Sequence, residues 1–143
     1  MRILLLIILS IVPVTVFTQV QINNPSESHI IYDKADIVIK TQHLKTDTVY
    51  TLLFRDDKYR YISEYKIINL RKAELKNFVD AISAISGPEY EEGAVADVLN
   101  NLKIVKLSGR ATIMVVGGDS GYKQLNKKTA AEIRRKVYEN VSF

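Results

Sequence analysis

The chain has 143 residues and carries 20 Lys and Arg side chains against 16 Asp and Glu, with no Cys and no Trp. This length holds one domain of ordinary size, and a hydrophobic content of 47% with 25% charged residues excludes disorder as the main state. The lack of Cys excludes disulfide frameworks, thiolate metal sites and cysteine nucleophiles. The two histidines, His29 and His43, lack metal-ligand spacing, so we expect neither a metal nor a cofactor.

The N-terminal segment has the pattern of a secretory signal peptide. A positive start at Arg2 precedes an almost wholly apolar run over residues 3–16. A retained transmembrane anchor is the alternative, but this run is shorter than the roughly 20 apolar residues that span a bilayer, and a proline interrupts it. The segment and the Cys-free composition resemble those of small exported proteins of Gram-negative bacteria. We therefore expect a signal peptide over residues 1–19, a flexible leader over residues 20–28 and a periplasmic or extracellular domain over residues 29–143.

Charge is divided unevenly along the chain. Residues 23–102 hold 10 basic and 13 acidic side chains, whereas residues 103–143 hold nine basic and three acidic ones. The basic C-terminal third can attract an anionic surface such as lipid headgroups or lipopolysaccharide. The alternative is that Lys127, Lys128 and residues 134–136 form the solvated face of a helix. We do not expect nucleic acid as a partner of an exported protein.

The first half of the domain has strand patterns. Residues 29–32 and 36–41 are strand-like, and residues 49–54 and 59–68 are rich in β-branched and aromatic side chains around a polar joint of hairpin length. Alternation in the last of these runs separates a face with three tyrosines from a face with three charged side chains. We expect a long antiparallel hairpin whose tyrosine face points inward, with the reverse left open for part of it.

The pattern then changes to a helical period. Residues 70–85 predict an amphipathic helix that Gly87 and Pro88 end. The apolar positions on one face of this helix are Leu75, Phe78, Val79, Ile82 and Ile85.

The remaining chain predicts a second group of strands and a second helix. Residues 94–101 predict a short helix or an irregular connection, and residues 102–107 and 111–116 predict a hairpin. Residues 122–125 predict a short strand or an extended approach to the last helix. Asn126 or Thr129 can cap the last helix, since Thr129 and Glu132 have the spacing of a capping box. The expected buried side of this helix consists of Ala130, Ile133, Val137 and Val141.

Strands that neighbour one another in sequence, interrupted by helices, indicate the α+β class. We expect one mostly antiparallel sheet of two hairpin units with two helices packed on one face, in a single small domain. No repeat of fixed period is present in the sequence, although a run of strands followed by a helix occurs twice.

One loop contains a residue pattern known from catalysis. Gly118–Gly121 reads Gly-Asp-Ser-Gly, which resembles the segment around the nucleophile of trypsin-like serine proteases. That family continues with Gly-Pro where this chain has Tyr122, and His43 lacks the surroundings of that family's histidine. The pattern therefore leaves two interpretations: a small serine hydrolase that uses Ser120 with His43 or Lys123, or a Gly-rich turn.

Without a complete catalytic constellation, the sequence favours a binding or interaction module. Tyrosines interleaved with basic residues in the first hairpin can form a recognition platform, although tyrosine is also a common strand residue. The partners we consider are an envelope protein, a glycan or an anionic surface, and an exposed strand edge can pair with a partner strand. The candidate binding residues are Tyr59, Arg60 and Tyr61 in the hairpin and Gly118, Asp119, Ser120 and Tyr122 in the Gly-rich loop.

Overall fold

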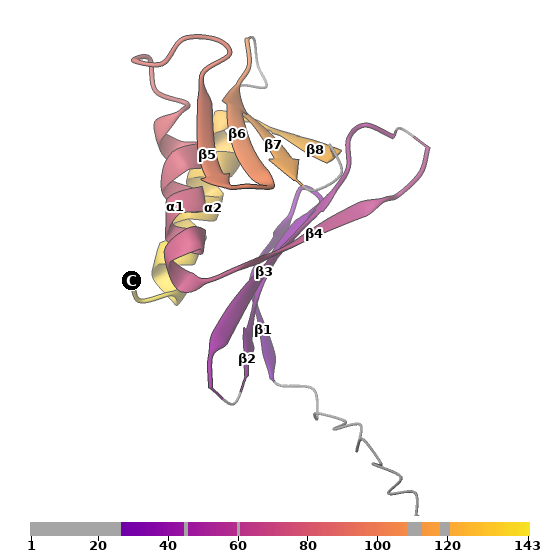
Figure 1. Ribbon diagram of the computed structural model, residues 1–143, viewed down its shortest axis with the longest axis vertical. Coiled ribbons are helices and arrows are strands. Elements are labelled where there is room, and N and C mark those ends of the chain that lie inside the picture. Colours follow the sequence, from indigo (N-terminus) through magenta and orange to yellow (C-terminus); the bar gives the residue numbers. More distant parts are fainter. Residues whose placement is uncertain (1–26, 45, 60, 109–112, 118–120) are drawn as a thin grey trace, which may run out of the picture.

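The computed structural model describes residues 27–44, 46–59, 61–108, 113–117 and 121–143. These residues form two four-stranded antiparallel sheets and two helices (Figure 1). The first sheet has the order β1-β2-β3-β4, with β1 Ser28–Lys34, β2 Ile37–His43, β3 Thr48–Arg55 and β4 Tyr65–Leu70. The second has the order β5-β6-β7-β8, with β5 Val95–Leu99, β6 Leu102–Lys106, β7 Ile113–Gly117 and β8 Gly121–Leu125. Helix α1 spans Lys72–Ala84 and α2 spans Lys127–Asn140.

The α+β class and the antiparallel pairing of neighbouring strands are confirmed. The strands are divided between two sheets rather than joined in one, because the chain leaves β4 through α1 before β5 begins. Figure 1 shows the two helices side by side, along one side of the molecule. No helix within the described ranges is long and apolar enough to cross a membrane.

The two halves of the chain have the same order of elements, four strands and then a helix. In both halves two residues join the first two strands and one residue joins the fourth strand to its helix. Buried apolar positions also correspond between the halves, at a constant separation of 55 residues from the fourth strand through the helix. These pairs are Leu70 with Leu125, Leu75 with Ala130, Phe78 with Ile133 and Ile82 with Val137. The domain is therefore built from two similar ββββα units, although their sequences show no obvious repeat.

Both helices bury the faces that their periodicity predicts. Every apolar position named above for the two helices is buried, and these positions join one hydrophobic core with the inner faces of both sheets. Asn126 is the N-cap of α2, since its side-chain oxygen accepts a hydrogen bond from the Thr129 backbone N–H at 2.8 Å. The alternative cap at Thr129 is therefore wrong, because Thr129 already lies within the first turn.

Two parts of the strand prediction need correction. Residues 95–99 form strand β5 instead of a helix, since they pair with β6. The second strand of the first hairpin begins at Tyr65 rather than at residue 59, and its tyrosine face is the outer one. The reason is that β4 leads directly into α1: Ile68 and Leu70 face the core beside that helix, so alternation turns Tyr65 and Ile67 to solvent.

Candidate interaction site

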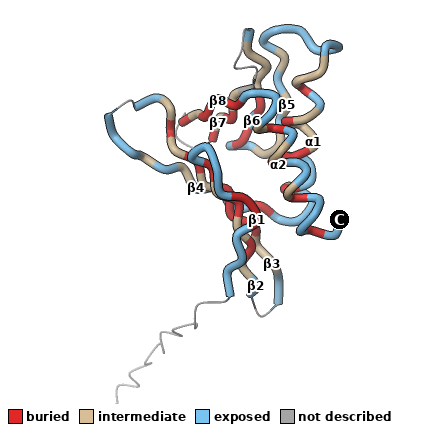
Figure 2. Tube along the Cα trace, turned by 180° about the vertical axis from the view of Figure 1, so that it is seen from behind, coloured by how far each residue is buried: buried red, intermediate tan, exposed pale blue. Residues whose placement is uncertain are grey.

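The connection between β3 and β4 projects from the body of the domain. We call residues 56–64 the arm. Figure 1 shows it reaching away from both helices, and Figure 2 shows that much of its length is exposed. Tyr61 is 97% exposed and Ile62 is 64% exposed. With Tyr59 in the arm and Tyr65 and Ile67 on β4, five of the eleven exposed large hydrophobic side chains within the described ranges lie in this one segment.

The arm has no counterpart of similar length in the second ββββα unit. Nine residues separate β3 from β4, whereas three separate β7 from β8. The β1–β2 and β5–β6 connections have two residues each, and the β2–β3 and β6–β7 connections have four and six. The arm is thus the largest difference between two otherwise similar units, and its exposed apolar side chains do not contribute to the shared core.

Two aspartates fix the base of the arm against the edge of β8. The Asp56 side chain is only 1% exposed, and its Oδ1 accepts hydrogen bonds from the backbone N–H groups of Lys58 at 2.9 Å and Tyr122 at 3.1 Å. The backbone N–H of Asp57 donates to the carbonyl of Tyr122 at 2.8 Å. These bonds satisfy polar groups at the outer edge of β8, which would otherwise be available to another strand.

A cluster of charged side chains surrounds this contact. The Lys123 side chain is 9% exposed, and its Nζ lies 2.9 Å from Asp57 and 3.5 Å from Asp36. The Lys66 Nζ lies 2.6 Å from Glu64 and 3.9 Å from Asp56. Removing one partner from such a buried pair is costly, because the remaining charge stays out of water. The cluster therefore holds the arm in a defined position between the two sheets.

The structure brings two of the predicted binding residues together. Tyr59 and Tyr122 line one small pocket at the base of the arm, and Tyr61 lies in the outer part of the arm. Ile62, Asp56 and Asp57 were not among the binding residues predicted from the sequence. The remaining predicted binding residues, Arg60, Gly118, Asp119 and Ser120, lie outside the described residues.

The two bases considered for a serine hydrolase lie in different surroundings. The Nδ1 of His43 and the hydroxyl of Thr48 are 3.1 Å apart, at the end of β2 farthest from Asp36. At about 3.3 Å per residue, the seven steps from Asp36 to His43 span roughly 23 Å. Since Asp36 contacts Lys123, His43 is far from β8, and the Lys123 amine is engaged by two carboxylates. Neither arrangement resembles a base held ready beside a nucleophile.

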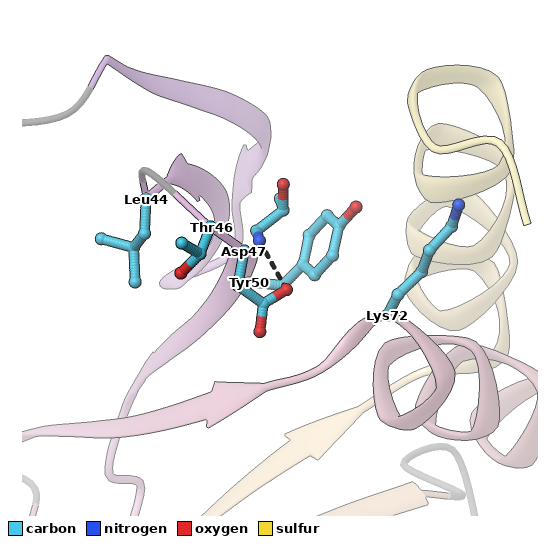
Figure 3. A pocket seen from close by; sticks show the side chains of 6 residues that line it. Leu44, Thr46, Asp47, Tyr50 and Lys72 are labelled. Atoms are coloured by element: carbon cyan, nitrogen blue, oxygen red, sulfur yellow. Dashed lines mark hydrogen bonds between the residues drawn. The ribbon is translucent and has the colours of Figure 1, made fainter.

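A second depression lies between the β2–β3 turn and the start of α1. Figure 3 shows Leu44 and Lys72 at opposite sides of it, with Tyr50 between them. The Asp47 carboxylate accepts a hydrogen bond from the Thr48 backbone at 2.7 Å, so it stabilises its own turn. Burial raises the pKa of Tyr50. The depression measures about 470 Å³.

Three of the five basic side chains of α2 form ion pairs within the molecule. Arg134 pairs with Asp80 of α1 at 3.3 Å, and Arg135 and Lys136 pair with Glu139 at 2.6 and 3.1 Å. Arg135 and Lys136 share the Glu139 carboxylate, so these pairs leave α2 with a net positive charge.

Comparison with known proteins gives no family. No protein-family model matches the sequence, and no curated protein matches it significantly.

Proposed function

We propose that this chain is a small exported interaction module that binds a protein partner through the outer part of its arm. The observation that carries the proposal is the group of exposed apolar side chains at Tyr61 and Ile62, continued by Tyr65 and Ile67 on β4. Exposed apolar side chains concentrated in one segment are a feature of interaction sites in soluble proteins. Tyrosine in particular is enriched among residues that dominate binding energy at protein interfaces.

The position of these side chains supports a role in binding a partner rather than in stabilising the fold. The arm is held at its base by Asp56 and Asp57, so its outer part does not need apolar side chains in order to fold. Fixing the base of the arm reduces the conformational freedom that the arm loses on binding, which leaves more of the contact energy for affinity.

Site-specific photocrosslinking tests the proposal. A photoreactive amino acid replaces Tyr61 in the full chain, expressed in its own cells, and a matched protein carries it in place of Tyr90. Tyr90 is also exposed but lies between α1 and β5. We expect one dominant protein adduct from position 61 that position 90 does not give. Equal adducts from both positions, or none from position 61, would contradict the proposal.

We propose that the module acts after export, in the periplasm or outside the cell. The support is the apolar run over residues 3–16 behind a positive start. Mass spectrometry of the soluble protein should find an N-terminus near residue 20. A soluble protein that retains Met1 would exclude this part of the proposal.

A hydrolase that uses Ser120 is the second candidate, and one substitution separates it from the first. For an interaction module, Ser120→Ala should leave both melting temperature and adduct formation nearly unchanged. Loss of a cellular phenotype with unchanged melting would favour the hydrolase.

A further inference from the structure

A pocket of about 340 Å³ opens at the base of the arm, where the two ββββα units meet. This volume lies at the lower end of the range of about 300–1,000 Å³ that is usual for small-molecule sites. The first unit contributes Arg55, Asp57 and Tyr59, and the second contributes Tyr122 and Gln124.

The walls of this pocket are held in place by hydrogen bonds between the units. The two oxygens of Asp57 accept from the Lys123 Nζ and from the Gln124 backbone N–H, each at 2.9 Å. The Asp57 backbone N–H donates to the carbonyl of Tyr122 at 2.8 Å. Because these contacts exist without a ligand, a bound molecule would meet a preorganised site.

Several groups of the pocket are still available to a ligand. Within the described residues, the side-chain amide of Gln124 and the hydroxyls of Tyr59 and Tyr122 make no hydrogen bond to protein. Arg55 forms one ion pair, at 3.4 Å to Asp36, and about two-fifths of its side chain is exposed. A guanidinium has five N–H donors, so most of them remain free for a ligand. The pocket thus combines two aromatic rings with donors and acceptors in fixed positions.

The charged side chains around the pocket are mostly paired within the protein. Arg55 and Lys123 pair with the carboxylates of Asp36 and Asp57, and Lys58 adds a cation whose Nζ lies 5.5 Å from the centre of the Tyr59 ring. A charged ligand would compete with one of these pairs and leave a group without its partner. An uncharged ligand with many hydroxyl groups meets no such cost.

We propose that this pocket binds a neutral sugar ring. The ring's hydroxyl groups would exchange hydrogen bonds with Arg55 and Gln124, while its C–H face would lie against a tyrosine ring. A sugar ring presents both hydroxyl groups and an apolar C–H face, and the pocket contains both hydrogen-bonding groups and tyrosine rings. The inference does not depend on Tyr61 and Ile62, so it stands or falls separately from the protein contact proposed for the arm.

A titration followed by NMR tests the inference. The probes are maltotriose and tri-N-acetylchitotriose, with sodium sulfate as an anionic comparison, and the readouts are the Gln124 side-chain amide and the Tyr122 backbone amide. We expect saturable shifts with at least one trisaccharide. Tyr59→Ala should weaken binding roughly ten-fold, about 1.4 kcal/mol. Tyr90→Ala is the matched control, since Tyr90 is 44% exposed against 40% for Tyr59.

The outcomes separate clearly. Gln124→Ala should also weaken binding, whereas Tyr61→Ser with Ile62→Ser should leave it unchanged. The inference is overturned if neither trisaccharide gives saturable shifts, if sulfate gives the same shifts, or if Tyr90→Ala weakens binding as much as Tyr59→Ala. Unchanged binding in both Tyr59→Ala and Gln124→Ala would overturn it as well.

Discussion

At the scale of single residues, the two units pack closely where Ile68 and Phe54 of the first unit lie against Gly117 of the second. Phe54 and Gly117 occupy corresponding places, because each lies opposite the first residue of its unit's second strand, Ile37 and Leu102. A Cβ atom at Gly117 would lie 2.6 Å from the Ile68 Cδ1 and 3.2 Å from the Phe54 Cζ. The first unit therefore fills space that the second unit leaves open.

Gly117→Ala should destabilise the protein by about 1–3 kcal/mol, because the added methyl group overpacks the core. The free energy of unfolding from denaturant titration measures this. Ile68→Val removes the Cδ1 atom at the closest approach, so the double variant should lose less than the two single variants added together. If the losses of unfolding free energy in the two single variants simply add in the double variant, the contact between residue 117 and the Ile68 Cδ1 does not cause the destabilisation.

Residue patterns predicted the buried faces of both helices but not the inner face of β4. The apolar face of a helix repeats over nearly four turns, so the sequence defines it several times. Strand β4 has only six residues, and isoleucine occurs on both of its faces, so alternation alone does not show which face is buried. Besides the connection to α1, the inner face of β4 packs Ile68 beside Gly117, which lies 49 residues away. No local pattern contains that information.

At the scale of elements, a strained turn joins β1 to β2. Ala35 and Asp36 have φ values of 56° and 60°, the left-handed conformation at both positions of a two-residue hairpin. This matches a type I′ turn, which favours Asn and Gly. An alanine there costs roughly 1–2 kcal/mol relative to an unstrained conformation.

Ala35→Asn should raise the free energy of unfolding by about 0.5–1 kcal/mol, since Asn tolerates the left-handed region better. Thermal melting gives the direction, and Ala35→Val should lower stability at the same position. A stabilised Ala35→Val variant would show that the turn does not adopt this conformation.

A polar contact joins the two helices. Asp80 of α1 accepts hydrogen bonds from Lys76 at 2.6 Å, from the Tyr138 hydroxyl at 2.8 Å and from Arg134 at 3.3 Å. Burial alone would raise the pKa of Asp80, but these donors outweigh it and lower the pKa. The contact therefore stabilises the fold above the unfolded pKa near 3.9 and is lost as the pH falls through the lower, folded value.

Asp80→Asn should lower stability at pH 7 by up to about 1 kcal/mol, the range for partly exposed charge pairs. The difference in unfolding free energy between this variant and the parent should shrink as the pH falls below about 4. Unfolding curves at several pH values measure this, and Asp97→Asn, at a more exposed pair with Lys103, should change little. A stability difference that grows in acid would contradict the lowered pKa of Asp80.

Sequence reasoning at this scale identified both helices and most strands, since propensity and periodicity are local. It did not identify β5, whose residues gain strand structure by pairing with β6. It also joined the arm to β4, because the tyrosines and isoleucines of residues 59–68 have high strand propensity whether or not they are paired.

At the scale of the whole molecule, two ββββα units share one core and differ most in the arm. The base of the arm joins the units through Asp56 and Asp57, and the outer part presents Tyr61 and Ile62 to solvent. The sequence indicated this region as a binding surface through its tyrosines. That Tyr59 and Tyr122 line one pocket could not be predicted, because it depends on how the two units pack.

The most direct measurement compares stability and binding in the Tyr61→Ser, Ile62→Ser double variant. Its control carries Tyr90→Ser and Leu44→Ser, at exposed positions in two other connections. The arm variant should unfold within about 0.5 kcal/mol of the parent, as exposed substitutions usually do. It should also bind the partner captured at position 61 at least roughly ten-fold more weakly, about 1.4 kcal/mol, while the control binds normally. A loss of several kcal/mol in stability, or unchanged affinity for that partner, would contradict the account.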